Sequence, residues 1–379
     1  MTSKIRIVFL CGCLEPGRDG VGDYVRRFAI ELSLQGHITA AISLADYCVS
    51  DEVLTTQREG NSILPVLRLP SIWQMEKRVK RAKVFVSKFD AQWLSLQFVP
   101  FSFHAKGLIF GLDKNLAWLG EGRYWHIMFH ELWVLSPFKE SIKLWLLGKI
   151  QKQLIKRVIT TLSPLAIHTQ TKFYQDQISK IGFNSLLLPL FSNIPQFTGK
   201  KNVINLSNLK YFDVKFVIFG NIHGNSLIRE FVMECATHSK SAGTRFCLIF
   251  IGRSGSEQQK FARLWTSFGM NFIEFGEQPT EIISEILSNS SHGLSTTPSF
   301  LIEKSGSAMA MLEHSLPVLC VAKTDETRLD NMQKLAPGIY QYYEGTLSEW
   351  LKNSEISEMT IGLPSIAKQY IHDLYIAGN

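Results

Sequence analysis

The sequence has no apolar run that approaches the roughly 20 residues needed to span a bilayer, so we expect no membrane-spanning helix. It has no cysteine pair at the spacing of metal ligands, no internal repeat and no low-complexity tract. No helix-turn-helix or RNP-type signature is present, which argues against a nucleic-acid partner. The stretch from Gly20 to Tyr24 lacks the third glycine of a dinucleotide fingerprint and the lysine of a P-loop.

What is present fits a globular protein. The 379 residues suit two domains of roughly 150–200 residues each. A net charge of +7 favours an anionic partner, such as a phosphorylated small molecule or an anionic membrane face. The six cysteines lie mostly in apolar runs and are expected to be reduced, as in a cytosolic protein. Lys4 and Arg6 precede a short apolar run that ends in charged residues, which predicts a first buried strand rather than a signal peptide. We expect a cytoplasmic protein and leave open a peripheral contact with the inner membrane face.

Short apolar runs alternate with amphipathic stretches, a pattern typical of parallel sheets covered by helices on both faces. The first series of expected strands is Ile5–Cys11, Ile38–Leu44, Ala91–Gln97, Tyr124–Phe129 and Val158–Leu162. The expected helices among them are Tyr24–Gln35 and Lys139–Lys156. A second series of expected strands is Phe216–Gly220, Phe246–Ile251, Phe272–Phe275, Gly293–Thr296 and Val318–Val321.

The stretch between the two series, Leu188 to Asn208, is rich in Pro, Asn, Ser and Gly and is expected to be a linker. The sequence therefore predicts an α/β protein with two doubly wound Rossmann-like domains facing across a cleft. The expected domains are residues 1–195 and 196–363, with a C-terminal helix at 364–379 that packs back on the first domain.

Three stretches could carry chemistry at strand ends. The loop at Gly20 to Tyr24 is either a tight turn before a helix capped by Asp23 or a place where backbone approaches a ligand. His130 and Glu131 end an expected strand, where His130 could bind a hydroxyl or move a proton. His104 follows another strand in an aromatic-rich loop that could shape an acceptor pocket, although a packed loop explains it equally well.

The stretch from Gly293 to Val321 gives the strongest signal. A strand is followed by Lys304, Ser305, Gly306 and Ser307, which open an Ala/Met/Leu-rich helix. Amides and hydroxyls at such a helix start, with a lysine beside them, suit a diphosphate. Glu303 could accept hydrogen bonds from sugar hydroxyls. The alternative is an ordinary capping serine beside a solvent-facing lysine.

Two basic segments fit an anionic membrane surface or, more simply, solvated faces of packed helices. The first contains Lys77, Arg78, Lys80, Arg81 and Lys83. The second, Lys139 to Arg157, alternates lysines with Leu and Trp.

These pieces together resemble a GT-B glycosyltransferase, most similar to the retaining group of family 4, over nearly the whole chain. The similar segments are "GVGDYVRRFAIELSLQGH", "HIMFHELW", "LPLFSNI", "FIEFGEQPTEIISEILSNSSHGLSTTP" and "SLPVLCV". The resemblance implies a nucleotide-sugar donor on the C-terminal domain, an acceptor on the N-terminal domain, and no metal or other cofactor. It places His130 near the donor sugar, Lys304 to Ser307 near the diphosphate, and Gly22 near the phosphates or the acceptor.

The sequence also departs from that group. The usual pair of glutamates is incomplete, because the second position falls on Ala310, and Glu313 lies a turn further along. Asn221, His223 and Asn225 stand where an arginine and a lysine are usual, and Arg253 could supply a cation instead.

We therefore expect a retaining glycosyltransferase that moves a sugar from a nucleotide-diphosphate donor to a glycan, lipid-linked or small-molecule acceptor. The rival hypotheses are a GT-B protein that binds a nucleotide or partner without catalysis, and another GT-B reaction such as sugar-nucleotide epimerisation. The expected catalytic residues are His130, Glu303 and Lys304. The expected diphosphate-binding residues are Gly22, Arg253, Lys304, Ser305, Gly306 and Ser307. The expected acceptor or sugar pocket contains Asp23, Tyr24, His104 and Glu131.

Overall fold

The computed structural model describes residues 4–135, 141–197, 206–253, 255–324, 335–354 and 362–378. The chain forms two compact units, Met1–Pro189 with Leu363–Asn379, and Leu190–Gly362. The first boundary falls after Pro189 rather than after residue 195, because Leu190 and Ile194 pack in the core of the second unit. No helix among the described residues is long and apolar enough to cross a membrane.

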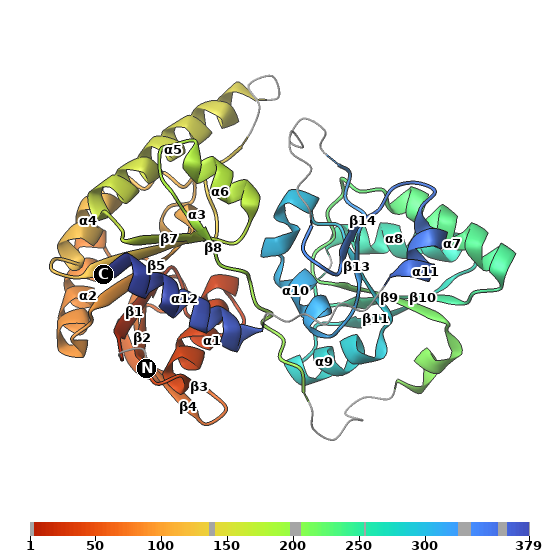
Figure 1. Ribbon diagram of the computed structural model, residues 1–379, viewed down its shortest axis with the longest axis horizontal. Coiled ribbons are helices and arrows are strands. Elements are labelled where there is room, and N and C mark those ends of the chain that lie inside the picture. The colour runs from red at the N-terminus through yellow and green to blue at the C-terminus, as the bar shows by residue number, and fades with distance from the viewer. Residues whose placement is uncertain are drawn as a thin grey trace. The chain divides into compact units, whose positions relative to one another are not determined.

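The first unit is built on an eight-stranded sheet of order β3-β4-β2-β1-β5-β6-β7-β8 (Figure 1). Its strands are β1 Arg6–Cys11, β2 Ile38–Asp46, β3 Val53–Glu59, β4 Ser62–Pro70, β5 Trp93–Phe98, β6 Tyr124–Phe129, β7 Ala166–Thr169 and β8 Leu186–Leu187. The paired strands are parallel except for β3, which runs antiparallel to β4. The central strands β1 and β5 are buried at nearly every position because helices cover both of their faces.

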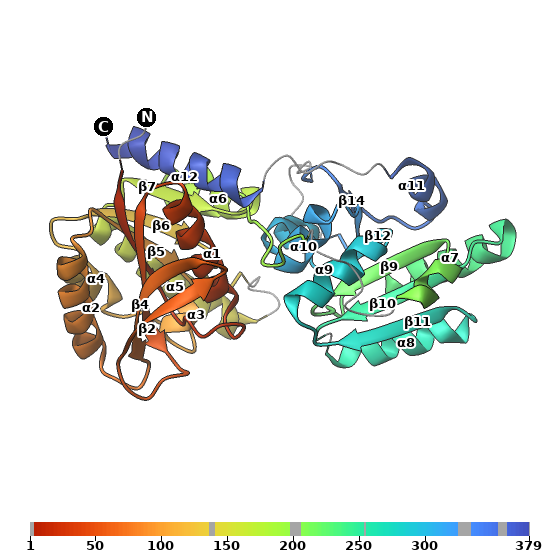
Figure 2. The same cartoon turned by 90° about the horizontal axis from the view of Figure 1, so that it is seen from below.

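Helices form a layer on each face of this sheet (Figure 2). The helices are α1 Gly20–Leu34, α2 Met75–Phe89, α3 Pro100–Phe103, α4 Leu112–Leu119, α5 Ile142–Leu162, α6 Lys172–Ser179 and α12 Leu363–Gly378. The C-terminal helix α12 packs beside α1, where Tyr370 lies against Phe9 and Phe28. On the other face, α2, α4 and α5 pack side by side.

The expected strand Val158–Leu162 is wrong. This segment is the last turn and a half of α5, and the next strand is Ala166–Thr169. The β-branched residues Val158 and Ile159 suggested a strand, but they continue the helical spacing of buried Leu154 and Ile155. Lys139 and Glu140, at the start of the expected helix, lie outside the described residues.

The second unit is built on a six-stranded parallel sheet of order β11-β10-β9-β12-β13-β14. Its strands are β9 Val214–Phe219, β10 Phe246–Ile251, β11 Asn271–Gly276, β12 His292–Ser295, β13 Val318–Cys320 and β14 Ile339–Gln341. Its helices are α7 Ile228–Ala242, α8 Ser256–Ser267, α9 Thr280–Asn289, α10 Gly306–Glu313 and α11 Leu347–Asn353, with short 3-10 helices at Ser207–Tyr211 and Ser299–Lys304.

The second unit has a separate apolar core on each face of its sheet. One core joins the sheet to α9 and α10, with Ile286 and Met311 among its buried residues. The other joins the sheet to α7, α8 and α11, and contains the buried side chains of Phe231 and Trp265. Each unit is therefore a doubly wound α/β structure, as the sequence predicts.

A buried ion pair fixes the loop that follows β1. The Asp46 carboxylate, fully buried at the end of β2, lies 2.8 Å and 3.1 Å from two Arg68 nitrogens. It also accepts a hydrogen bond from the Leu14 amide at 3.1 Å, and Arg68 continues to Glu15 at 2.5 Å. Burial alone would raise the pKa of Asp46, but the hydrogen bonds from Arg68 and from the backbone lower it to about 2.

We predict that Asp46→Ala lowers the free energy of unfolding by about 3–5 kcal/mol, because Arg68 is then buried without its main partner. The exposed pair of Glu52 and Arg81 provides a control, and Glu52→Ala should cost only about 0–1 kcal/mol. Urea unfolding of the three proteins at pH 7 measures both effects. Equal costs would show that the Asp46–Arg68 pair does not stabilise the unit.

The same pair predicts acid sensitivity. Because the folded-state pKa of Asp46 lies below the ordinary value of 3.8, its stabilisation is complete above that pH and is lost as the pH falls towards about 2. This contribution should be missing from the stability profile of Asp46→Ala.

Candidate active site

Each sheet has one topological switch point, where successive strands stop being added on one side and start being added on the other. Ligands of open α/β sheets bind beside such points, at the carboxyl ends of the strands. In the first unit this switch point lies between β1 and β5, and in the second it lies between β9 and β12. At the first switch point, the chain after β1 lies close to the chain after β5. A side chain at Gly12, just after β1, would come within 2.5 Å of Ser102 in α3.

The β1–α1 loop departs from the tight-turn reading of the sequence in the residue that caps the helix. Helix α1 starts at Gly20, and its N-cap is Asp19, whose carboxylate accepts a hydrogen bond from the Gly22 amide at 2.7 Å. Asp23 therefore lies inside the helix and does not cap it. Gly22 is needed for packing within the unit, because a Cβ there would collide with the Cys13 carbonyl oxygen.

The neighbours of Gly22 are also engaged within the first unit. Asp23 accepts hydrogen bonds from the Gly17 amide at 3.0 Å and from Arg26 at 2.8 Å. Tyr24 is buried, with its ring stacked on Phe28 and edge-on to His130. These contacts hold the loop and give Tyr24 a role in the core, so the expected acceptor pocket at Asp23 and Tyr24 stays a prediction.

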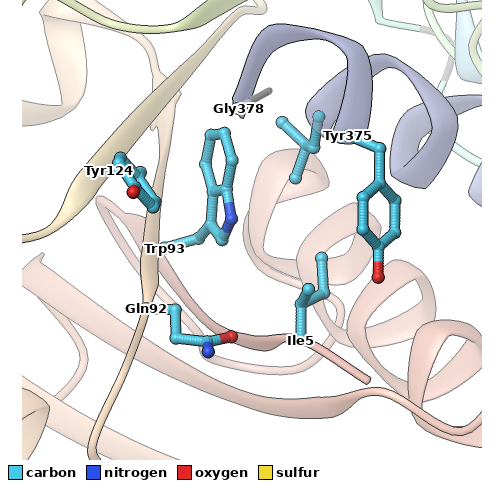
Figure 3. A pocket seen from close by; sticks show the side chains of 7 residues that line it. Ile5, Gln92, Trp93, Tyr124, Tyr375 and Gly378 are labelled. Carbon is cyan, nitrogen blue, oxygen red and sulfur yellow. The ribbon is translucent and has the colours of Figure 1, made fainter. Parts of the chain in front are cut away.

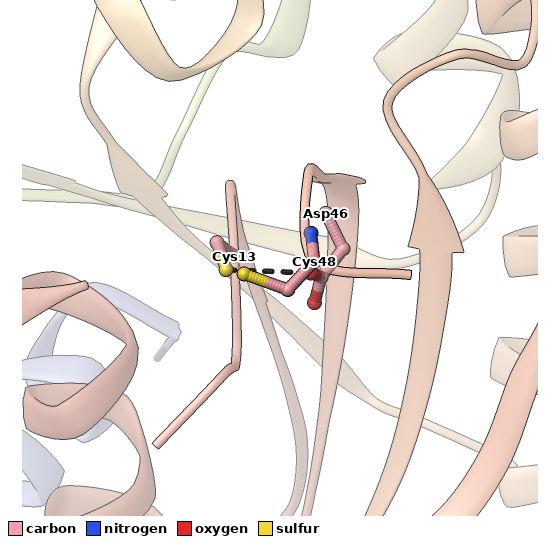
Figure 4. A group of neighbouring side chains, drawn as sticks. All are labelled: Cys13, Asp46 and Cys48. Carbon is pink, nitrogen blue, oxygen red and sulfur yellow. Dashed lines mark hydrogen bonds between the residues drawn. The ribbon is translucent and has the colours of Figure 1, made fainter. Parts of the chain in front are cut away.

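Cys13, Asp46 and Cys48 form a group beside this loop (Figure 4). Their ligand atoms lie within 4.8 Å of one another, close enough for a metal ion. The donor set does not suit one, because Asp46 is already paired with Arg68 and burial raises the pKa of the Cys13 thiol to about 12. The Cys13 thiol instead donates to Asp46, at 3.3 Å. Cys48 is exposed, unlike the other five cysteines.

His130 follows β6 and is buried, with both ring nitrogens hydrogen-bonded. Its Nε2 lies 2.9 Å from Gln97 Oε1, and its Nδ1 lies 3.2 Å from Gln170 Nε2. The adjacent Glu131 is partly exposed. His104 is exposed in the loop after α3, and its Nδ1 accepts from the amides of Lys106 and Leu108 at 3.1 Å and 3.2 Å. The packed-loop alternative therefore describes His104 well.

In the second unit, several loops meet at the carboxyl edge of the sheet. Gly220 follows β9 with a φ of +86°, a conformation that favours glycine. The loop after β9 is hydrogen-bonded to the end of β12 across the switch point, because the His223 amide donates to Thr296 Oγ1 at 2.8 Å. A Cβ on Gly220 would lie 3.8 Å from Ser307, so the end of β9 is next to the start of α10.

The start of α10 has the geometry that the sequence predicts. Ser305 is the N-cap, and its Oγ accepts from the Ala308 amide at 3.3 Å and lies 3.1 Å from Ser307 Oγ. Space is open around Gly306, since a Cβ there would meet no atom within 4 Å. Glu303 and Lys304 precede the cap in the Ser299–Lys304 turn, and burial raises the pKa of Glu303.

Arg253 follows β10 at the same edge. Its guanidinium forms an exposed, two-bond ion pair with Glu277, at 2.6 Å and 2.8 Å. Exposed pairs of this kind contribute little to stability, so an anionic ligand could compete for the arginine. Glu277 could not be identified as its partner in advance, because the two residues are brought together only by folding.

Ala310 and Glu313 both make contacts inside the second unit. Ala310 is fully buried in α10. Glu313 accepts a hydrogen bond from the Ser192 amide at 2.7 Å, and its carbonyl oxygen accepts one from Gln196. Glu313 therefore fastens the first segment of the second unit to α10.

Sequence reasoning missed a set of buried polar residues around His130. They recur at every second position of otherwise apolar strands: Ser95, Gln97, His126, His168 and Gln170. A period of two places such residues on one face of a sheet. That spacing was the available signal.

A hollow of about 160 Å³ lies at the opposite, amino edge of the first sheet (Figure 3). Residues at the starts of strands line it with the end of α12, including Ile5, Trp93 and Tyr124. It is smaller than the roughly 300–1,000 Å³ of small-molecule sites and lies away from the strand ends where ligands bind. We therefore do not assign the active site to it.

No protein-family model matches the chain, and a search of curated protein sequences finds no match. Solved structures do match over nearly its whole length. A glycosyltransferase from Rickettsia africae is 12% identical with a TM-score of 0.54, covering 99% of this chain and 94% of that one. Starch synthase IV from Arabidopsis thaliana, bound to ADP and acarbose, is 12% identical with a TM-score of 0.57 and covers 99% of both chains.

UDP-GlcNAc 2-epimerase from Neisseria meningitidis, bound to UDP-GlcNAc, is 10% identical with a TM-score of 0.56 and covers 98% of this chain and 100% of that one. Such low identities establish the fold alone. The chain has the GT-B fold, which nucleotide-sugar glycosyltransferases and UDP-GlcNAc 2-epimerases share.

Proposed function

We propose that this protein is a nucleotide-sugar-dependent glycosyltransferase that transfers a sugar with retention of configuration. The start of α10 beside the β9–β12 switch point is the observation that carries the proposal. The second unit would bind the nucleoside diphosphate of the donor there. The first unit would bind a glycan, lipid-linked or small-molecule acceptor.

The start of α10 suits a diphosphate in three ways. The helix itself has no acceptor for the Gly306 and Ser307 amides, and the partial positive charge of its dipole lies at this end. The Ser305 and Ser307 hydroxyls supply further donors. The open space at Gly306 lets a phosphate approach the backbone.

Charged residues would complete the site. Lys304 would neutralise the leaving diphosphate, and Arg253 would assist after leaving Glu277. Glu303, kept more easily protonated by burial, would hydrogen-bond a sugar hydroxyl. His130 would contact the donor sugar. Catalysis would then depend on placement and on stabilising charge in the leaving group.

The second candidate is sugar-nucleotide binding without transfer, including epimerisation. Ala310 favours it, because no carboxylate stands at the position where the resemblance expects a ribose contact. The epimerase of the same fold, solved with UDP-GlcNAc, shows that this fold also serves that reaction.

A thermal-shift panel of UDP, ADP, GDP and their common sugars tests nucleotide binding. A ligand at 100 times its Kd should add about 2.7 kcal/mol of stability. Lys304→Ala should weaken that ligand about 10- to 100-fold without lowering the melting temperature of the free protein, because one charge-assisted contact is worth about 1.5–3 kcal/mol. Lys260→Ala, on the exposed surface of α8, is the control and should bind normally.

Product analysis then separates the candidates. Transfer to an added acceptor supports the glycosyltransferase, whereas a changed sugar nucleotide without acceptor supports epimerisation. Binding with neither product supports a binding protein. Unchanged affinity in Lys304→Ala would refute the site.

We also propose that α5 contacts an anionic membrane surface. Ile142, Leu146 and Ile150, spaced four residues apart on one side of α5, are 60%, 54% and 38% exposed. Exposed Lys143 and Lys149 flank them. An exposed apolar stripe with lysines beside it suits the interface of an anionic bilayer. In the other basic segment, Arg78 is buried and donates to the Leu44 carbonyl, and Arg81 pairs with Glu52.

We predict that the protein co-sediments with phosphatidylglycerol vesicles more strongly than with phosphatidylcholine vesicles. Leu146→Glu should reduce this binding at least about tenfold. The substitution replaces an apolar side chain that would be buried in lipid with a charged one. Ile72→Glu changes an equally apolar residue, 78% exposed elsewhere on the first unit, and should have no effect. Equal binding by both variants would contradict the assignment of α5.

A further inference from the structure

Seven side chains of the first unit form one continuous chain of hydrogen bonds, which we call the polar wire. In order they are Gln170, His130, Gln97, Ser95, His126, His168 and Asp373. The six links measure 3.2, 2.9, 2.7, 2.8, 2.9 and 3.1 Å in that order. The wire runs from the ends of β6 and β7 to α12.

The wire is buried along its length. Each member from Gln170 to His168 is at most 6% exposed, and the Asp373 side chain is 14% exposed. Tyr24 of α1 packs edge-on against His130, and Tyr370 of α12 packs edge-on against His126. With water kept away, these polar groups hydrogen-bond to one another, and the Tyr370 hydroxyl adds a longer contact of 3.5 Å to His126 Nδ1.

With His168 neutral, the acceptor chemistry of Asp373 sets the direction of each link. A carboxylate only accepts, so His168 must donate to Asp373 through Nε2–H. A neutral His168 then accepts at Nδ1, which requires His126 to carry its proton on Nε2. His126 Nδ1 accepts in turn from the Ser95 hydroxyl. Burial, together with the His168 and His130 rings, lowers the pKa of His126 well below its ordinary value, in agreement with a neutral ring.

The remaining links follow the same direction. Ser95 donates its hydroxyl hydrogen to His126 Nδ1 and accepts from Gln97 Nε2. Gln97 Oε1 is then the atom that faces His130, so His130 carries its proton on Nε2. Its Nδ1 is left as an acceptor, held by Gln170 Nε2 over the longest of the six links.

We propose that Asp373 is a positioning residue that acts through the polar wire to hold His130 in its Nε2–H tautomer, with Nδ1 presented as an acceptor. A substrate hydroxyl that displaces Gln170 would donate to that Nδ1 without reversing the wire. Asp373 belongs to the segment that returns from the second unit, so the docking of α12 sets the chemistry of a residue in the first unit. The proposed function enters at one point only, where it identifies the substrate hydroxyl as that of a sugar.

The tautomers can be read by NMR of protein labelled with ¹⁵N-histidine, without any substrate. The ten histidines are assigned by single substitutions. In the unaltered protein, His130, His126 and His168 should each show the proton on Nε2 alone. Asp373→Leu removes the end acceptor and should turn the single His130 tautomer into a mixture. Asp373→Asn keeps an oxygen acceptor and should restore the single form.

Two further variants separate the wire from the packing of α12. Lys368→Leu removes an exposed charge on the same helix and should leave all three tautomers unchanged. Ser95→Ala breaks the wire in the middle while Asp373 stays in place, and should produce the His130 mixture with His168 unaltered. Ser95→Ala therefore tests whether the wire sets the His130 tautomer even if Asp373→Leu fails to fold.

A His130 that keeps a single Nε2–H tautomer in both Asp373→Leu and Ser95→Ala would overturn the proposal. So would a His130 that carries its proton on Nδ1 in the unaltered protein. Because this readout needs no nucleotide, failure of the thermal-shift panel would refute the proposed function and leave the tautomer result standing.

Discussion

The parallel pairing of β9 with both β10 and β12 is the constraint on which the account of the second unit depends. Parallel strands all end at the same edge, and in a doubly wound sheet the order of the strands reverses at one point along it. The reversal lies next to β9, where Gly220 ends the strand and α10 begins nearby. Ser305 then accepts from the Ala308 amide of α10, and the space around Gly306 is open. The proposed diphosphate site thus follows from topology and one helix cap.

The first unit meets a different constraint, the burial of many polar groups. Asp46 and Arg68 compensate one another, and their hydrogen bonds hold the β1–α1 loop. The polar wire offsets the cost of burying three histidines, since each ring nitrogen has a hydrogen-bond partner. A buried network satisfied throughout is rigid and specific, whereas one that loses a member leaves unpaired groups in a region without water.

Much of the fold could be predicted from the sequence, because apolar runs of strand length alternate with amphipathic helices. The prediction of a strand at Val158–Leu162 was wrong. β-branched residues favour strands locally, but packing keeps these residues in α5. The α10 start could be predicted because capping is local. The partners of Arg253, Glu313 and His168 could not, because Glu277, Ser192 and Asp373 are brought to them only by folding. Asp19 rather than Asp23 caps α1, a shift of one helical turn that the glycine pattern did not indicate.

Hydrogen–deuterium exchange gives the most direct test of the central claim, that the start of α10 binds a nucleoside diphosphate. The Gly306 and Ser307 amides at the start of α10 have no intrahelical acceptor and exchange readily until a ligand covers them. With the nucleotide that stabilises the protein most, the account predicts slower exchange at residues 305–309 and at 220–223, after β9. Unchanged exchange at residues 305–309, with protection elsewhere in the chain, would contradict it.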